Sequence, residues 1–159
     1  MMADARFEDG DVAPLRLIAQ DAADVSVISA LLQDAVLPVG EMRLDRKRRR
    51  LVALVNRFRW EDREAALNAG RPYERVRSLL TIEDVLAAQT LGVDLSSRDT
   101  VLSILSLDWQ PGQDGTGRLV LTLAGDGAVA LEVEALDARL DDVTKPYVAP
   151  SRRAPDHAA

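Results

Sequence analysis

Short segments in which apolar and polar residues alternate dominate this sequence, and turn-forming stretches separate them. Residues 100–109 and 118–124 alternate in this way, and residues 110–117 between them contain one proline and three glycines. A Gly-Asp-Gly triplet at 125–127 then leads into a further alternating segment, 129–136. A period of two residues is that of a β-strand, and glycine and proline favour turns. Because links this short join antiparallel neighbours, the pattern predicts consecutive hairpins.

The first two thirds of the chain extend the same pattern. Strand-like segments are expected at residues 15–19, 36–44, 51–60, 75–82 and 85–93. The second of these bends at Pro38 and Gly40, and a charge-dense hairpin tip at 45–50 separates it from the third. Residues 61–72 are interpreted as a loop with room for one helical turn. The crossover helices that a parallel sheet requires are missing, so an antiparallel sheet is favoured.

Residues 81–91 leave two structures open. Thr81 followed three residues later by Asp84 resembles a capping box and could start a helix. The sequence favours the alternative, a strand that turns back at Glu83 and Asp84.

One segment has helical periodicity. Asp21 or Asp24 can cap it, and it is expected to end near Gln33. Its apolar residues recur at the spacing of an amphipathic helix: Val25, Ile28, Leu31 and Leu32. Together these elements predict an α+β fold that is mainly antiparallel β, a curled sheet or small barrel of about seven or eight strands with one early helix.

The length and the residue usage indicate one domain. A chain of 159 residues is the usual size of a single domain and buries roughly two-thirds of its unfolded surface. Residues 12–143 are predicted to form the globular domain. After Val143 the chain is rich in proline, alanine and arginine, so residues 144–159 are predicted to be a disordered C-terminal tail.

Residue usage also points to a cellular setting. The sequence has no cysteine, which excludes disulfides and thiolate metal sites and fits the reducing cytoplasm. No run of 18 apolar residues occurs, so no membrane span is expected. The cations are 18 arginines and 2 lysines, and alanine is abundant, a usage typical of a GC-rich bacterial genome. We therefore expect a bacterial cytoplasmic protein.

No motif predicts a catalytic residue, a metal site or a cofactor. The only histidine, His157, lies in the expected tail. The acidic pairs Glu61-Asp62 and Asp141-Asp142 lack the spacing of a calcium loop. The glycine-containing loop at 112–117 joins two strands and has no helix N-terminus to bind phosphate.

The charge is unevenly distributed. The chain carries a net charge of −6, yet residues 41–77 contain 12 Lys/Arg against 6 Asp/Glu, a local charge of +6. An acidic surface repels phosphate, so nucleic acid is not an expected partner overall. Five consecutive cations at 46–50, the basic hairpin tip, allow one alternative, weak RNA contact. No aromatic side chain lies in that tip to stack on a base.

Two arginine-containing segments predict a binding site. They are Asn56-Arg57-Phe58-Arg59-Trp60-Glu61 and Glu74-Arg75-Val76-Arg77. If they form neighbouring antiparallel strands, four guanidinium groups can share one face and bind a phosphate, a carboxylate or an acidic peptide. The expected ligand-binding residues are Asn56, Arg57, Arg59, Trp60, Arg75 and Arg77. The structural alternative is that these arginines pair with Glu41, Glu61, Glu74 and Glu83, which stabilises a sheet by roughly 0.2–1 kcal/mol per pair.

Three functions follow as hypotheses. The favoured one is a non-enzymatic binding or adaptor module whose arginine-rich sheet face engages an anionic small molecule or an acidic protein partner. The second is a small cytoplasmic enzyme or metabolite-binding protein with Asn56, Arg57 and Gln33-Asp34 at the mouth of a barrel, which requires a concave site. The third is RNA contact through the basic hairpin tip. The oligomeric state is not indicated.

Several segments resemble a family of short alphaproteobacterial proteins that is classified as a domain of unknown function. The matching segments are Ser29–Ala35, Asn56–Glu61, Glu74–Ser78, Leu121–Gly127, Val133-Glu134 and Arg139–Asp141, with the Asn-Arg-Phe-Arg-Trp-Glu string as the signature. The similarity spans about residues 15–142. It implies a bacterial, cytoplasmic, single-domain protein and supplies no activity, cofactor or catalytic residue.

Overall fold

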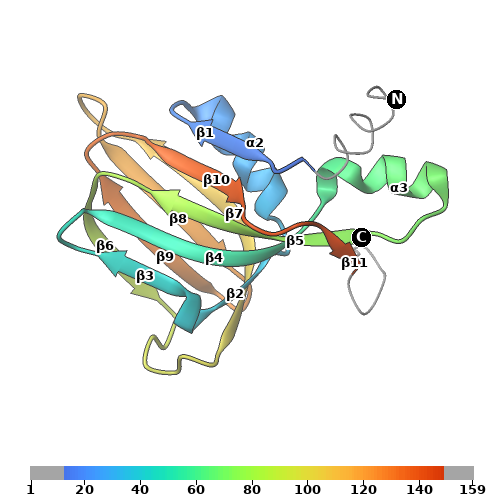
Figure 1. Cartoon of the computed structure of the whole chain (residues 1–159). Coiled ribbons are helices and arrows are strands. Elements are labelled where there is room, and N and C mark those ends of the chain that lie inside the picture. Colours follow the sequence, from blue (N-terminus) through green and yellow to red (C-terminus); the bar gives the residue numbers. More distant parts are fainter. Residues whose placement is uncertain (1–12, 149–159) are drawn as a thin grey trace.

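The computed structural model describes residues 13–148 (Figure 1). In this range one sheet of eleven strands, paired antiparallel throughout, is accompanied by two α-helices and two 3₁₀ helices. The strands are β1 (Arg16–Ala19), β2 (Val36–Pro38), β3 (Met42–Asp45), β4 (Arg50–Phe58), β5 (Glu74–Ile82), β6 (Val85–Leu91), β7 (Val101–Pro111), β8 (Gly117–Leu123), β9 (Gly127–Val133), β10 (Ala138–Asp142) and β11 (Tyr147–Val148). The helices are α2 (Ala22–Leu32), α3 (Arg63–Ala69), η1 (Val39–Glu41) and η2 (Trp60–Asp62).

The sheet curls because two neighbouring strands turn a corner together. Its order is β1-β10-β5-β4-β2-β7-β8-β9-β6, with β3 added to β4 and β11 added to β5. β5 continues into β6 through Glu83 and Asp84, and β9 continues into β10 through residues 134–137. Backbone hydrogen bonds of 2.9 Å from Glu83 N to Asp137 O and from Glu134 N to Asp84 O join the two bends. The corner therefore folds one half of the sheet over the other (Figure 1).

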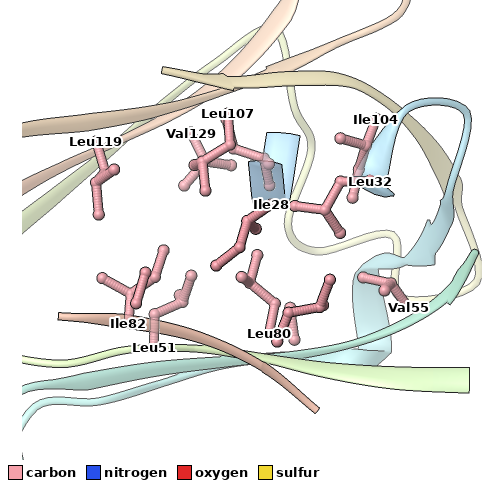
Figure 2. Close-up of a cluster of buried hydrophobic side chains, with 14 of the residues drawn as sticks. Ile28, Leu32, Leu51, Val55, Leu80, Ile82, Ile104, Leu107, Leu119 and Val129 are labelled. Carbon is pink, nitrogen blue, oxygen red and sulfur yellow. The ribbon is translucent and has the colours of Figure 1, made fainter. Parts of the chain in front are cut away.

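Helix α2 packs one face, made by Val25, Ile28, Leu31 and Leu32, into the interior of the curled sheet. Asp21 caps it, because its side chain accepts a hydrogen bond of 2.8 Å from Asp24 N. Figure 2 shows Ile28 and Leu32 of the helix between Ile104 and Leu107 on one side and Leu80 on the other. Burying such a side chain stabilises a fold by about 1.5–3 kcal/mol. The predicted early helix, including its cap and its end at Gln33, is confirmed.

The predicted strand count of seven or eight is too low. The expected strand at 36–44 is split by η1, because the chain turns after Pro38. β10 and β11 are absent from the predicted strands, because β10 is short and mostly charged and β11 has only two residues. The loop at 61–72 holds a second helix, α3, and the strand expected at 51–60 ends at Phe58.

The ambiguous segment at 81–91 is a strand, as favoured. The chain turns at Asp84, which adopts a left-handed conformation with φ of 58°, and β6 follows. Residues 144–148, assigned from sequence to a disordered tail, include β11, which pairs with Arg75 and Glu74 of β5. The remainder of that predicted tail, residues 149–159, lies outside the described residues.

Candidate functional site

The register of β4 and β5 decides where the predicted arginines lie. Asn56 is paired with Arg77 and Phe58 with Arg75, so both arginines lie on the outer face of the curled sheet. Arg57 is opposite Val76, on the inner face, and is fully buried. The predicted single arginine face is therefore wrong. Side chains one residue apart point to opposite faces of a strand, so this register divides the four arginines.

Arg57 is the centre of a closed polar network. Its Nε donates to Ser78 Oγ at 2.9 Å, and Nη1 and Nη2 donate to the Glu61 carboxylate at 2.9 and 2.8 Å. Nη2 also donates to Asp142 Oδ1 at 3.0 Å. Burial disfavours the charge, but the hydrogen bonds and negative charges of Glu61 and Asp142 outweigh it and raise the pKa of Arg57. The guanidinium is therefore held charged inside the protein.

Asp142 completes this network from β10. Ser78 Oγ donates to its Oδ1 at 2.7 Å, and the backbone N–H of Leu15 donates to its Oδ2 at 2.9 Å. Among residues 13–148, no buried side-chain nitrogen or oxygen lacks a hydrogen-bond partner. The network thus ties together β4, β5, β10 and the chain entering β1. Its donors and acceptors are used by one another, so Arg57 has a structural role.

A second group of ion pairs extends this network beyond the end of β4. Arg59 is nearly buried, and its Nη1 lies 2.5 Å from Glu74 Oε1 and 3.5 Å from Asp62 Oδ2. Arg71 binds the Asp62 carboxylate with two hydrogen bonds of 2.6 and 2.7 Å. These bonds from Arg71 are the main reason that the pKa of Asp62 is lowered. We call both groups together the arginine network: Arg57, Arg59, Arg71, Glu61, Asp62, Glu74, Ser78 and Asp142.

Trp60 also has structural contacts. Its Nε1 donates to Gln33 O at 2.9 Å, which fixes η2 to the end of α2. Its ring packs edge-on against Phe58, with centroids 4.6 Å apart, and against the hydrophobic core. These contacts give Trp60 a structural role.

Three of the six predicted site residues do meet on the outer face. Arg75 Nε donates to Asn56 Oδ1 at 2.8 Å, and Asn56 Nδ2 donates to the Tyr147 hydroxyl of β11. Burial lowers the pKa of Arg75. Arg77 is exposed and borders a cavity of about 210 Å³ that is also lined by Asn56 and by Glu41. The acid on this rim makes the cavity a poor match for an anion.

The structure does not assemble the first alternative site, at a barrel mouth, and leaves the second, the basic hairpin tip, untested. Asn56 and Arg57 point to opposite faces of β4, so the polar site at a barrel mouth is not assembled. Three cations of the basic hairpin tip have acidic partners: Arg48 pairs with Asp45, Arg49 with Glu134 and Asp84, and Arg50 with Glu83. RNA contact through the tip stays a prediction. His157 lies outside the described residues, and within 13–148 no three acidic or histidine side chains cluster to hold a metal.

A different cavity, of about 370 Å³, lies between β3, β6 and the loop that follows β6. Its lining is apolar except for Thr90 and three arginines, and it contains no acid: Val39, Met42, Arg43, Leu44, Arg46, Leu51, Ala88, Thr90, Leu95, Arg98 and Val129. We call it the β3–β6 cavity. Sequence reasoning missed it, and the one signal that pointed toward it was the excess of cations at 41–77.

The β3–β6 cavity forms where the two halves of the curled sheet leave an open side. Among the described strands β3 pairs only with β4, and β6 pairs only with β9. One end is closed by the hydrogen bond of 2.8 Å from Val85 N to Arg49 O. The other end is closed by the loop, through the hydrogen bond of 2.9 Å from Gly40 N to Arg98 O. Leu51 and Val129, both buried, form the floor.

The arginines of the β3–β6 cavity differ from those of the arginine network. Arg43, Arg46 and Arg98 are exposed, and no carboxylate in the described part of the chain lies within 4.0 Å of their guanidinium groups. Arg98 Nη2 donates to a neutral acceptor, Gly40 O, at 3.0 Å. Three positive charges therefore surround an apolar cavity in a protein whose net charge is −6.

These features define a small α+β protein, a curled antiparallel sheet with one amphipathic helix packed against its interior. One group of its arginines is paired internally and another surrounds a cavity. Residues 15–157 match the family model described as Protein of unknown function (DUF2948), and the chain belongs to this family. No curated protein and no solved structure shows significant similarity to it. No helix in residues 13–148 has both the length and the apolar character needed to cross a membrane.

Proposed function

We propose that this protein is a binding module that holds an anionic ligand with an apolar body in the β3–β6 cavity. The observation that carries the proposal is the lining of the cavity, in which three arginines that pair with no acid of residues 13–148 surround apolar side chains. The binding function expected from the sequence is retained in this proposal, but its site moves from the arginine network to the open side of the sheet. The proposal keeps the bacterial, cytoplasmic setting that residue usage predicts.

The chemistry of the cavity supports this class of ligand. A guanidinium group offers a planar set of donors that matches a carboxylate or a phosphate. Leu51 and Val129 offer an apolar floor, and burying apolar ligand surface contributes about 25 cal/mol per Å². The volume of about 370 Å³ lies in the range of small-molecule sites, roughly 300–1,000 Å³. A ligand with an acidic head and an apolar body satisfies both parts of the lining.

The test compares a charged and an uncharged probe of the same length. Octanoate is expected to raise the melting temperature and to give a measurable heat of binding, whereas octanol is expected to bind more weakly because it lacks the carboxylate. Replacing Ala88 by phenylalanine is expected to fill the cavity and abolish binding of octanoate while the protein stays folded.

The matched control removes the same number of charges elsewhere. The variant Arg43→Gln, Arg46→Gln, Arg98→Gln is compared with Arg16→Gln, Arg63→Gln, Arg139→Gln, whose positions lie on β1, α3 and β10, outside the cavity lining. Only the first variant is expected to lose binding of octanoate. Equal affinity in both variants, or no binding by the unmodified protein, would falsify the proposal.

A further inference from the structure

The free edge of β6 suggests what the ligand is. Between Val85 and Leu91 this strand has no charged residue and no proline, and the side chains of Leu86 and Leu91 are 54% and 58% exposed. Edge strands are usually protected by charges, prolines or bulges, because their unpaired N–H and C=O groups can pair with another chain. Here the one such device is an irregularity of register between Val85 and Ala87. As far as residues 13–148 are concerned, most of the edge is therefore open to pairing.

We propose that the ligand is an extended acidic peptide of a partner protein, which adds to β6 as a further antiparallel or parallel strand. This inference rests on the proposed function, since the same arginines bind the acidic side chains. In such β-strand addition, main-chain hydrogen bonds supply affinity, and pockets for alternating side chains supply specificity.

The surroundings of β6 provide room for those side chains on both faces. Ala88 and Thr90 line the β3–β6 cavity. A second cavity, of about 300 Å³, is lined by Ala87, Gln89, Ala130 and Glu132, and Ala88 borders both cavities. Successive side chains of a strand point to opposite faces, so a peptide on this edge sends alternate side chains toward each cavity. The alanines at 87 and 88 are small enough to let its backbone approach.

The charges favour an acidic peptide over a second copy of this chain. Arg43 and Arg46 lie on the β3 side of the cavity, and Arg98 lies in the loop at its other end. Pairing two β6 edges would bring two such sets of arginines close together, and like charges across an interface are unfavourable. A peptide with carboxylates spaced along an extended backbone neutralises them instead.

The test uses a capped octapeptide of alternating valine and glutamate, and two controls. One control has the same side chains with every second amide N-methylated, which removes main-chain donors and leaves the charge unchanged. The other replaces glutamate by lysine. Affinity is measured by calorimetry, and amide hydrogen exchange is followed residue by residue in the full-length protein.

The expected result is that the acidic peptide slows exchange at alternate amides of residues 86–91. The N-methylated peptide is expected to bind about tenfold more weakly, because it loses main-chain hydrogen bonds, and the lysine peptide is expected not to bind. Equal affinity of the acidic and N-methylated peptides, or binding without protection of β6, overturns strand addition. Amides of β6 that all exchange slowly before peptide is added also overturn it, because another segment or a second copy then covers the edge.

Octanoate separates this inference from the proposed function. If octanoate binds with the expected dependence on Arg43, Arg46 and Arg98 while the acidic peptide does not bind, the ligand is a small molecule and only the inference fails. If neither binds, both fail.

Discussion

The arginine network and the β3–β6 cavity use the same side chain for opposite purposes. In the network Arg57 and Arg59 are buried, and each contacts two carboxylates within 3.5 Å. Around the cavity Arg43 and Arg46 are exposed, and no acid in the described chain pairs with them. The two groups lie in different parts of the molecule. The network joins β4, β5 and β10 to η2 and to the loop before β5, whereas the cavity arginines lie on β3, in the hairpin tip after it and in the loop after β6.

The contrast shows that an arginine-rich segment does not by itself mark a binding site. Removing one partner from a buried ion pair leaves an uncompensated charge, whereas changing an exposed, unpaired charge alters the folded state little. The arginine network should therefore control stability, and the β3–β6 cavity should control binding. Four experiments test this division of roles.

The largest effect is expected from Arg57→Met. The substitution keeps much of the volume but leaves Asp142 and Glu61 without their guanidinium partner, so the free energy of unfolding should fall by about 3–5 kcal/mol. The matched control, Arg43→Met, should change it by less than about 0.5 kcal/mol. Urea denaturation measures the free energy of unfolding of both variants. Similar losses of stability would contradict the division of roles between the network and the cavity.

A smaller effect, with a characteristic pH dependence, is expected from Asp62→Asn. The variant should be about 1–3 kcal/mol less stable than the unmodified protein near neutral pH, because Arg71 and Arg59 lose a charged partner. The pKa of Asp62 lies below its ordinary value of 3.8, so its stabilisation is complete above that pH and is lost as the pH falls below it. Denaturation curves at several pH values should show that the difference in free energy of unfolding between the variant and the unmodified protein becomes smaller below about pH 3.8. A difference that is constant down to the lowest pH would argue against a stabilising role for the carboxylate.

A weaker effect is expected from Arg46→Gln. Loss of one exposed charge should weaken octanoate binding about three- to fivefold, which corresponds to about 0.6–1 kcal/mol. Its stability should stay within about 0.5 kcal/mol of the unmodified protein. Calorimetry and denaturation on the same preparation check both, and Lys47→Gln in the same hairpin tip is the control, since Lys47 does not line the cavity.

The smallest effect is expected from salt, which should act differently on ligand binding at the β3–β6 cavity and on the stability that the arginine network contributes. Raising sodium chloride from 0.05 to 0.5 M should weaken octanoate binding a few-fold, because exposed charges are screened. The stability difference between Arg57→Met and the unmodified protein should change little, because buried pairs are screened much less. Salt titrations of both quantities test this, and an equal response in the two regions would remove the distinction.

The sequence predicts the hairpins and the helix well because each depends on a local pattern. The 3.6-residue spacing of Val25, Ile28 and Leu32 identifies α2, and the Gly-Asp-Gly triplet identifies the turn before β9. The local pattern does not predict β10, because its five residues, Ala-Arg-Leu-Asp-Asp, are mostly charged. Only contacts with β1 and β5, distant in sequence, make it a strand.

The candidate site could be predicted only in part, because alternation within a strand does not give its register against the next one. Both faces of β4 begin with apolar residues, Leu51 and Ala53 on one side and Val52 and Leu54 on the other, so the sequence leaves the inner face undecided. The structural alternative, pairing with glutamates, is confirmed for two of the four arginines, since Arg57 pairs with Glu61 and Arg59 with Glu74. Glu83 pairs instead with Arg50. The β3–β6 cavity depends on where the sheet fails to close, which no local pattern encodes.

The position of Arg57 has a consequence for how β4 finds its place during folding. If β4 shifted by one residue against β5, the guanidinium of Arg57 would move to the opposite face of the sheet. Ser78 and Asp142 would then be left in the interior with no cation. An aliphatic residue at position 57 would tolerate several alignments, because hydrophobic contacts are not directional. The buried charge thus makes misaligned strand pairings unfavourable. It selects a single alignment of β4, β5 and β10, of which β10 lies far from the other two in the chain.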